Sequence, residues 1–522
     1  MMSYEKVVLS DSPGDYKLPF SEWWENQREV AEDVLGMVKA EQTIILSCPT
    51  AFGKSAIPAL ASKVSPWRVT TMVGTRDLQQ QYQDSFDWFD VVWGRQHYDC
   101  ILPSRIDQWE VAYGEKPSFA DCAHKGAEQS CVVAMDCPYL AAKAKALSGV
   151  ARVLNYHYAY YADWWRSNPG VVVCDEAHTL PNTIIGLTSI DIGANTRKKF
   201  RLARFPAVNG SSKRALEPAV AWVGKALLAI EKWVGLAKRI GGDERELETA
   251  DTLFRKLEDI KGFLSEADDD EWYVSTDMRE DAMRIRPVHP AKYASKILLK
   301  APATILMSAT PGNIDVLCGD LGLKREEVQF VSAPHVIPEE QRPIFIHPDA
   351  PRMSAKTQLP AYKRQADMMA DIMRRHEGQK GVIHTASWRH AELVVELLRH
   401  TGRMMLAKGA RLETIQKFRE APKGTVAVSP SWDHGLNFEG DAARFTIVSK
   451  VPFMNYGDPI VRLRLKAKGG RTWYDNDACL RVVQACGRIV RSVDDWGFSY
   501  ILDNNWSRVS KHAPEWFKVQ QL

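Results

Sequence analysis

The chain has 522 residues, enough for about three or four domains at ~100–200 residues each. Hydrophobic residues make up 45% and charged residues 25%, the balance of a globular protein, and no apolar run approaches the ~20 residues that span a bilayer. The net charge of +3 neither requires nor excludes nucleic acid, because basic residues can gather in one groove. Residues 1–17 include acids and no apolar signal region, so we expect a soluble, intracellular (cytoplasmic) protein without a membrane partner.

Eight short apolar runs are typical of buried parallel strands, and helical patterns lie between them. Four runs lie in the first part of the chain, at 43–48, 69–74, 171–176 and 304–309. Four lie in the last part, at 381–386, 425–430, 445–450 and 498–503. Strands that alternate with helices predict an α/β fold with parallel sheets, here in two similar halves.

Two stretches break this alternation inside the first half. Residues 98–150 hold four of the nine cysteines, and residues 190–290 are charged and helical in pattern. We therefore expect two insertions in a first unit and an uninterrupted second unit. The predicted parts of the first unit are 1–97, 151–189 and 291–335, and the second unit is 336–522.

The first run leads into the loop Pro49-Thr50-Ala51-Phe52-Gly53-Lys54-Ser55, which precedes a helical pattern. Small residues at a helix start let backbone N–H groups point at phosphates, so Thr50 and Gly53 are candidate nucleotide contacts. Lys54 would reach the β- and γ-phosphates, and the Ser55 hydroxyl would bind Mg²⁺. Cys48 and Ala51 stand where glycine is common in such loops. The alternative is an ordinary turn with an exposed lysine.

The run at 171–176 ends in an acidic sequence, Asp175-Glu176-Ala177-His178. Two carboxylates at the end of a buried strand are costly unless they bind a metal or take part in chemistry. We expect Asp175 to hold Mg²⁺ through water, Glu176 to activate the attacking water, and His178 to sense the γ-phosphate. A solvated acidic loop is the alternative, and the nearby phosphate loop argues against it.

Two further motifs follow predicted strands or lie near the C-terminus. Ser308-Ala309-Thr310 could couple the two halves through hydrogen bonds, although such a motif alone is a weak signal. In the segment 484–491, Gln484, Arg488 and Arg491 are candidate catalytic residues. On a helix, Arg488 and Arg491 would share one face and could neutralise charge on the transferred phosphoryl group. The alternative is a basic surface helix.

The clustered cysteines Cys100, Cys122, Cys131 and Cys137 are separated by 21, 8 and 5 residues. This spacing differs from the close CxxC pairs of most zinc ribbons. Four thiolates can hold a [4Fe–4S] cluster or Zn²⁺, and the spacing alone leaves that choice open. Either metal would fix a loop-rich insertion in one rigid shape, whereas four buried thiols without a metal would not.

Candidate nucleic-acid contacts follow two of the predicted strands. Thr75 and Arg76 come after the run at 69–74, and Ser431 and Trp432 come after the run at 425–430. Contacts with phosphates would make binding independent of base sequence and sensitive to salt. Trp432 could stack on a base or belong to the core.

Together these residues resemble the XPD/DinG family of superfamily 2 iron–sulfur DNA helicases, from about Gln27 to Asp503. Several segments that are typical of the family occur in the same order here. They are Gln27 ahead of the phosphate loop, 75–79 (TRDLQ), 137–140 (CPYL), 155–157 (NYH), 450–453 (KVPF) with 458–459 (DP), and 484–503 (QACGRIVRSVDDWGFSYILD).

The resemblance implies two RecA-like motor domains, with an iron–sulfur domain at 98–150 and a helical arch domain at 190–290, both inserted in the first. It implies that Gln27 contacts adenine, that Thr75 and Arg76 touch the nucleic acid backbone, and that the four cysteines hold a [4Fe–4S] cluster rather than zinc. The implied activity is unwinding of forked or tailed duplex DNA by a motor that hydrolyses Mg-ATP and moves 5′ to 3′ on single-stranded DNA. We expect a monomer.

The chain departs from the family in motif V. Where relatives have Glu-Gly-x-Asp, it has His434 and Asn437 at the two charged positions, and Asn505 replaces a later arginine. These two substitutions lie in the motif that couples the state of the bound nucleotide to the binding of DNA. A translocase or remodelling ATPase that does not unwind DNA is therefore a second hypothesis. A non-catalytic nucleic-acid-binding subunit is a third, and the intact Lys54 and Asp175 argue against it.

Overall fold

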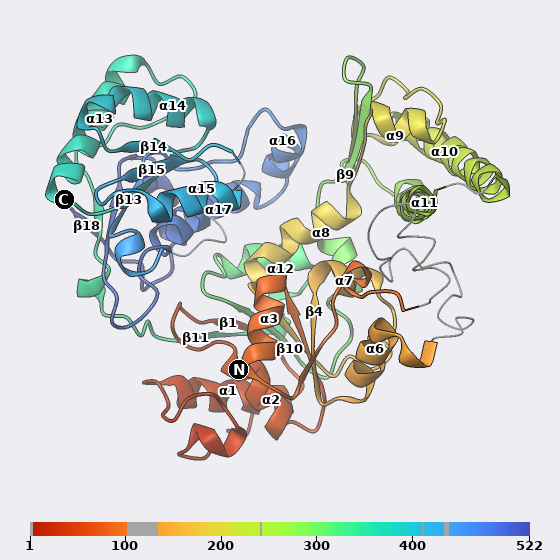
Figure 1. The fold of residues 1–522 in the computed structure, drawn as a ribbon, viewed down its shortest axis with the longest axis horizontal. Helices are drawn as coiled ribbons and strands as arrows, with labels where there is room; N and C mark the ends of the chain where they lie inside the picture. Colours follow the sequence, from red (N-terminus) through yellow and green to blue (C-terminus); the bar gives the residue numbers. More distant parts are fainter. Residues whose placement is uncertain (1–3, 102–133, 241–242, 410, 433–437) are drawn as a thin grey trace.

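The computed structural model describes residues 4–101, 134–240, 243–409, 411–432 and 438–522. Two seven-stranded sheets, each flanked by helices, form two lobes that lie side by side (Figure 1). Every strand pairing within these two sheets is parallel. The prediction of an α/β fold with parallel sheets is thus confirmed.

The first sheet has the strand order β11-β1-β10-β5-β2-β4-β3. Its strands are β1 (Thr43–Ser47), β2 (Val69–Val73), β3 (Phe89–Val91), β4 (Ala151–Asn155), β5 (Val171–Asp175), β10 (Thr304–Ser308) and β11 (Val328–Ser332). Side chains alternate between two hydrophobic cores, since Ile44 and Leu46 enter one core and Ile45 enters the other. The described helices that surround this sheet are α1 (Gln27–Lys39), α2 (Ala56–Val64), α3 (Arg76–Ser85), α6 (Pro138–Ser148), α7 (Tyr156–Tyr161), α8 (Leu180–Thr188) and α12 (Ile314–Leu321).

The second sheet has the order β14-β15-β13-β16-β17-β12-β18. Its strands are β12 (Ile344–Ile346), β13 (Gly381–His384), β14 (Met404–Leu406), β15 (Val426–Ser429), β16 (Phe445–Val448), β17 (Phe498–Ile501) and β18 (Val519–Gln521). The helices of this lobe are α13 (Leu359–Arg375), α14 (Trp388–Leu397), α15 (Arg411–Glu420), α16 (Pro459–Lys466), α17 (Gly470–Cys486) and α18 (Trp506–Val509). Because all strands are parallel, their carboxyl ends lie at one edge, where ligands bind in such folds.

A third, antiparallel sheet with the order β6-β9-β8-β7 lies between α8 and β10 in the chain. Its strands are β6 (Ile190–Ile192), β7 (Asn209–Gly210), β8 (Trp272–Asp277) and β9 (Ala282–Pro287). The accompanying helices are α9 (Ala194–Lys199), α10 (Lys213–Arg239) and α11 (Glu244–Ser265), and α10 packs against α11 beside the small sheet (Figure 1). The helical pattern was visible in the sequence, but the small sheet was not expected from it.

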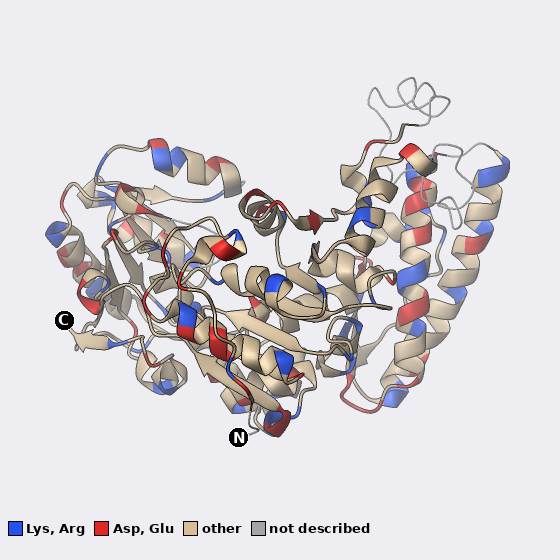
Figure 2. Ribbon diagram, turned by 90° about the horizontal axis from the view of Figure 1, so that it is seen from below, with Lys and Arg blue, Asp and Glu red and all other residues tan. Residues whose placement is uncertain are grey.

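Charged residues of both signs are interspersed along the ribbon of the two lobes and of the long helices α10 and α11 (Figure 2). This distribution agrees with the small net charge of +3. Within the described parts of the chain, no helix has the length and apolar character needed to cross a membrane.

Candidate nucleotide site between the two lobes

The phosphate loop connects β1 to α2 and contains two residues with left-handed backbone. Ala51 has φ 68° and Gly53 has φ 78°. A Cβ at Gly53 would lie 2.5 Å from Nε2 of Gln27, so only glycine fits there. Ala51 adopts a conformation that costs a non-glycine residue about 1–2 kcal/mol. Its side chain packs against a core cluster of the second lobe that includes Ile489, so the loop contacts both lobes.

Gln27 is buried, at 1% exposure, and braces this loop. Its Nε2 donates to the backbone oxygen of Phe52 at 2.9 Å, and its Oε1 accepts from the backbone N–H of Trp24 at 3.1 Å. Both ends of the amide thus bind protein groups in this structure. Contact of Gln27 with adenine stays a prediction.

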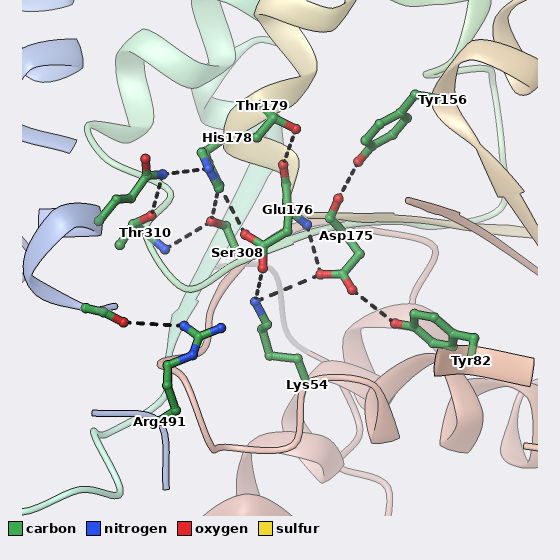
Figure 3. A network of polar contacts seen from close by, with 12 residues as sticks. Lys54, Tyr82, Tyr156, Asp175, Glu176, His178, Thr179, Ser308, Thr310 and Arg491 are labelled. Carbon is green, nitrogen blue, oxygen red and sulfur yellow. Dashed lines mark hydrogen bonds and ion pairs between the residues drawn. The ribbon is translucent and has the colours of Figure 1, made fainter. Parts of the chain in front are cut away.

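The lysine of the loop faces the two acids at the end of β5 (Figure 3). Nζ of Lys54 lies 2.6 Å from Oε1 of Glu176 and 4.0 Å from Oδ1 of Asp175. Oδ1 of Asp175 also accepts from the backbone N–H of Glu176 at 2.8 Å. Residues 122 positions apart in the chain therefore meet because β1 and β5 both flank β10 in the sheet.

Two buried tyrosines that sequence reasoning missed hold Asp175. The hydroxyl of Tyr82, on α3, donates to Oδ2 of Asp175 at 3.3 Å. The hydroxyl of Tyr156, on α7, donates to the backbone oxygen of Asp175 at 2.7 Å. These contacts fix the carboxylate and the backbone at the end of β5. Tyr156 lies in the segment 155–157 that carries the family resemblance, which was the only signal for it in the sequence.

The buried charged groups in this cluster shift one another's pKa values. Burial raises the pKa of Asp175 to about 6, although the Lys54 ammonium opposes the change. Burial alone would raise the pKa of Glu176, but Lys54 outweighs it and lowers that pKa to about 2. Burial would lower the pKa of Lys54, yet Glu176 and then Asp175 outweigh it and raise that pKa. Glu176 is thus held as a carboxylate paired with Lys54.

His178 links the acidic motif to the end of β10 and to the second lobe (Figure 3). Its Nδ1 lies 2.8 Å from the hydroxyl of Ser308, and its Nε2 lies 2.7 Å from Nε2 of Gln484. The Gln484 amide also donates to the Thr310 hydroxyl at 3.4 Å. If the Gln484 amide donates to Nε2, the ring proton resides on Nδ1 and points to Ser308. A chain of polar contacts therefore crosses from one lobe to the other.

Arg491 faces the acids from the second lobe, but not from a helix. Helix α17 ends at Cys486, so the expectation that Arg488 and Arg491 share a helical face is wrong. Nη1 of Arg491 donates to the backbone oxygen of Gly487 at 3.4 Å. Burial lowers the pKa of Arg491, and the Glu176 carboxylate opposes that shift, which places the guanidinium within electrostatic range of the acids.

Arg488 lies in the turn after α17, where its backbone oxygen accepts from the N–H of Phe438 at 3.0 Å. Thr50 and Ser55 lie in the phosphate loop, partly exposed, and Ser55 directly precedes α2. His434 and Asn437 of motif V lie outside the described residues.

The candidate nucleic-acid contacts divide into three exposed residues and one buried residue. Thr75 and Arg76 are exposed at the start of α3, and Ser431 is exposed after β15. Trp432 is only 1% exposed and packs against Phe418 and Phe438 in the core. Trp432 is therefore a core residue and is not available to stack on a base.

Two of the four clustered cysteines fall within the described residues. Cys100 is 7% exposed and Cys137 is 6% exposed, and Cys137 directly precedes α6. Cys122 and Cys131 lie outside the described residues. In the part of the chain that the structure describes, no group of three or more His, Cys, Asp or Glu side chains could hold a metal ion.

Comparison with known proteins agrees with this arrangement. Residues 369–520 match the family of the helicase C-terminal domain. The chain is 23% identical to the ATP-dependent DNA helicase YoaA of Escherichia coli strain K12, over 92% of this chain and 91% of that protein. It is also 23% identical to YoaA of Haemophilus influenzae, over 74% of this chain and 69% of that protein.

Solved structures of XPD helicases share the fold. One has a TM-score of 0.62 at 15% identity and covers 95% of this chain and 99% of that structure. Xpd4 of S. tokodaii has a TM-score of 0.57 at 12% identity, again over 95% of this chain. The matched C-terminal domain, the named helicase relatives and the shared fold together support an XPD/DinG-family helicase of superfamily 2.

Proposed function

We propose that the chain is an ATP-dependent DNA helicase that moves along single-stranded DNA and hydrolyses Mg-ATP between its two lobes. One observation carries the proposal: Lys54, Asp175 and Glu176 of the first lobe face Gln484 and Arg491 of the second. Such an arrangement can enclose a nucleotide, and its hydrolysis would then depend on the position of one lobe relative to the other. That two similar proteins are named ATP-dependent DNA helicases supports it.

The Lys54–Glu176 pair suggests how the binding of ATP could activate Glu176 as a base. While Lys54 holds Glu176, the carboxylate has a pKa of about 2 and is a weak base. The β- and γ-phosphates of ATP would draw Lys54 away, and the pKa of Glu176 would then rise. Glu176 could then accept a proton from the attacking water, while Arg491 balances charge on the transferred phosphoryl group.

The oxygen donors Asp175 and Ser55 fit Mg²⁺, which prefers a few carboxylate or hydroxyl ligands and substrate phosphates. When bound, Mg²⁺ would neutralise phosphate charge. Tyr82 and Tyr156 hold Asp175 in place for this role, at 3.3 Å and 2.7 Å.

His178 and Gln484 are proposed to report the γ-phosphate state across the lobe interface. Their ring and amide nitrogens are 2.7 Å apart, and each lobe supplies one of them. Loss of the γ-phosphate would change the surroundings of His178 and so the fit of Gln484. Repeated closure and opening would move the lobes along a bound strand.

A [4Fe–4S] cluster is proposed on Cys100, Cys122, Cys131 and Cys137, with zinc as the alternative. Burial of both Cys100 and Cys137, at the two ends of the segment that contains the other two, fits a closed thiolate site. When bound, the cluster would fix the shape of this insertion. Anaerobically purified protein should be brown with broad visible absorbance. A colourless preparation with stoichiometric zinc would rule the cluster out.

DNA contacts are proposed at the exposed residues Thr75, Arg76 and Ser431, with the α9–α11 insertion as the helical arch of the family. Contacts with phosphates give binding that weakens as salt rises. The partners would be single-stranded DNA and forked or tailed duplexes.

A directional strand-displacement assay tests the proposal. Duplexes with a 5′ tail should be unwound in the presence of Mg-ATP, and those with a 3′ tail should not. The altered motif V, with His434 and Asn437, favours a translocase without unwinding as second candidate. ATP hydrolysis that single-stranded DNA stimulates, without displacement from either tail, would select the translocase. Absence of any ATP hydrolysis would defeat both.

A further inference from the structure

Helix α12 belongs to the first lobe, and the second lobe holds it at both ends. It follows β10 through a short loop, so that Ser308, Thr310 and the start of α12 are consecutive features of the chain. Ser308 contacts His178, and Thr310 contacts Gln484. Any shift at the nucleotide would therefore reach α12 directly.

The first end of α12 contacts α17 of the second lobe. Oδ1 of Asn476 accepts from the backbone N–H of Asn313, the residue that caps α12, at 2.8 Å. Asn476 is 6% exposed. Gly312 has φ 73°, and a Cβ there would lie 2.8 Å from Oδ1 of Asn476 and 2.9 Å from Cδ1 of Leu480. The loop and α17 thus approach so closely that only glycine fits.

The other end of α12 contacts α16. Asp320, near the C-terminus of α12, accepts a charged hydrogen bond from Arg464, whose exposure is only 4%. The ring of Trp473 lies 3.8 Å from the Arg464 guanidinium. A buried pair of this kind resists separation, because either charge alone would be left poorly solvated.

The contacts on α17 lie on one face of that helix. Asn476, Leu480 and Gln484 are spaced four residues apart, so they occupy successive turns on the same side. Asn476 fixes this face against the loop before α12, and Gln484 meets His178 and Thr310 two turns later. The position of Gln484 at the nucleotide site therefore depends on the contact at Asn476.

We infer that Asn476 and Arg464 are positioning residues that dock α12 between the lobes and so set the approach of Gln484 to His178. The inference rests on the proposed function, in that Gln484 acts through an ATP site. Neither residue is among the groups proposed to bind the nucleotide; each acts by holding a first-lobe element in place.

Two substitutions at Asn476 and one control separate positioning from general loss of structure. Asn476→Ala removes the acceptor for the Asn313 N–H. Asn476→Asp keeps an acceptor, and its charge would lie beside the N-terminus of α12, where negative charge is favourable. Lys417→Gln is the control, because it removes an exposed ion pair with Glu413 on α15, wholly inside the second lobe.

The kinetic measurement is ATP turnover with saturating single-stranded DNA. Asn476→Ala should lower kcat roughly three- to tenfold, the effect of one lost interlobe hydrogen bond, while KM for ATP changes less than about twofold. Asn476→Asp should recover most of kcat, and Lys417→Gln should match the unmodified protein. Equal losses in Asn476→Asp and Asn476→Ala, or wild-type kcat in Asn476→Ala, would overturn the inference.

Hydrogen exchange gives a readout that does not need hydrolysis. The peptide that contains the Asn313 amide should exchange faster in Asn476→Ala and regain protection in Asn476→Asp. Unchanged exchange in Asn476→Ala would overturn the docking inference even in an active enzyme. A wild-type protein that shows this protection pattern but no ATP hydrolysis would refute the proposed function and leave the docking of α12 standing.

Discussion

Lys54 binds Glu176 in this structure, so its substitution tests both substrate binding and the base. Lys54→Ala should lower ATP hydrolysis by roughly two orders of magnitude or more, because a charge that stabilises the phosphoryl group is lost. Steady-state phosphate release would measure this. The exposed Lys39, at the end of α1, provides a control substitution to alanine that should leave the rate unchanged. Hydrolysis retained by Lys54→Ala would place the site elsewhere.

Gly53 is the residue whose replacement should damage the phosphate loop most directly. Gly53→Ala would bring a Cβ to within 2.5 Å of Nε2 of Gln27 at a left-handed φ of 78°. We expect the affinity for an ATP analogue, measured by titration, to fall about tenfold, from strain on the order of 1–2 kcal/mol. Gly378→Ala is the control, because that glycine also has a left-handed φ, of 72°, but lies in the second lobe with open space for a Cβ. An unchanged affinity in Gly53→Ala, or an equal loss in Gly378→Ala, would contradict this account.

The residues that bear phosphate and acid chemistry could be predicted, because each follows a strongly apolar strand within a short motif. Tyr82 could not, since nothing in a helical pattern indicates contact with an acid 93 positions away. The helical geometry predicted for Arg488 and Arg491 was wrong because α17 ends one residue before Gly487. Trp432 shows that a strand-to-loop exit does not by itself expose an aromatic ring.

At the scale of elements, the eight apolar runs correspond to β1, β2, β5, β10, β13, β15, β16 and β17, which are interior strands of the two sheets. The strands β3, β12, β14 and β18 were missed because each has three residues, too few for a pattern. The edge strand β11 was missed because polar residues interrupt its apolar ones. β4 was missed because it contains Arg152. This arginine is 1% exposed and donates to Thr70 and to the backbone oxygens of Trp165 and Asn168.

A further contact between the lobes joins the small antiparallel sheet to the start of α16. The guanidinium of Arg286, on β9, donates to both carboxylate oxygens of Asp458 at 3.1 and 3.2 Å. Tyr273, Val288 and Ile460 pack beside this pair. The insertion thus rests on the second lobe as well as the first.

Asp458→Asn should weaken this contact without unfolding α16. Oδ1 of Asp458 caps the helix by accepting from the N–H of Ile460 at 2.9 Å, and asparagine can do the same. A half-exposed pair is worth about 0.5–1 kcal/mol, so we expect strand displacement per ATP to fall roughly two- to fivefold. Displacement and hydrolysis would be measured together.

Arg284→Gln is the control, since the partner of Arg284, Asp191, lies in the same small sheet. An equal effect of Arg284→Gln would count against the interlobe role.

For the molecule as a whole, buried neutral histidines predict loss of stability in mild acid. Burial lowers the pKa of His390 to about 4, with Lys450 adding to the shift, and burial with Arg342 does the same for His335. The unfolded chain, with a histidine pKa of about 6.5, binds these protons more readily, so stability falls as pH drops from about 6.5 towards 4.

His390→Gln tests this linkage, because glutamine does not titrate. His390 is 5% exposed, so its contribution to acid destabilisation would be about 2 kcal/mol at pH 5. Melting temperatures at pH 7.5 and pH 5.0 would be compared. The difference between the two pH values should be smaller in His390→Gln than in the unmodified protein. An identical difference would show that His390 does not contribute.

The division into two sheets could be predicted from the whole sequence, whereas the way the lobes meet could not. The contacts His178–Gln484, Asn313–Asn476 and Asp320–Arg464 join residues more than 140 positions apart, and each partner alone resembles an ordinary polar residue. Only the folded chain brings them together.

One nucleotide is proposed to be hydrolysed by groups from both lobes, and Arg491→Ala separates this shared site from a site within the first lobe alone. Binding of an ATP analogue and DNA-stimulated ATP hydrolysis would be measured side by side. We predict that Arg491→Ala binds the analogue within about threefold of the unmodified protein yet hydrolyses ATP at least about a hundredfold more slowly, because the second lobe supplies charge to the transition state. Full hydrolysis by Arg491→Ala would contradict a site shared between the lobes.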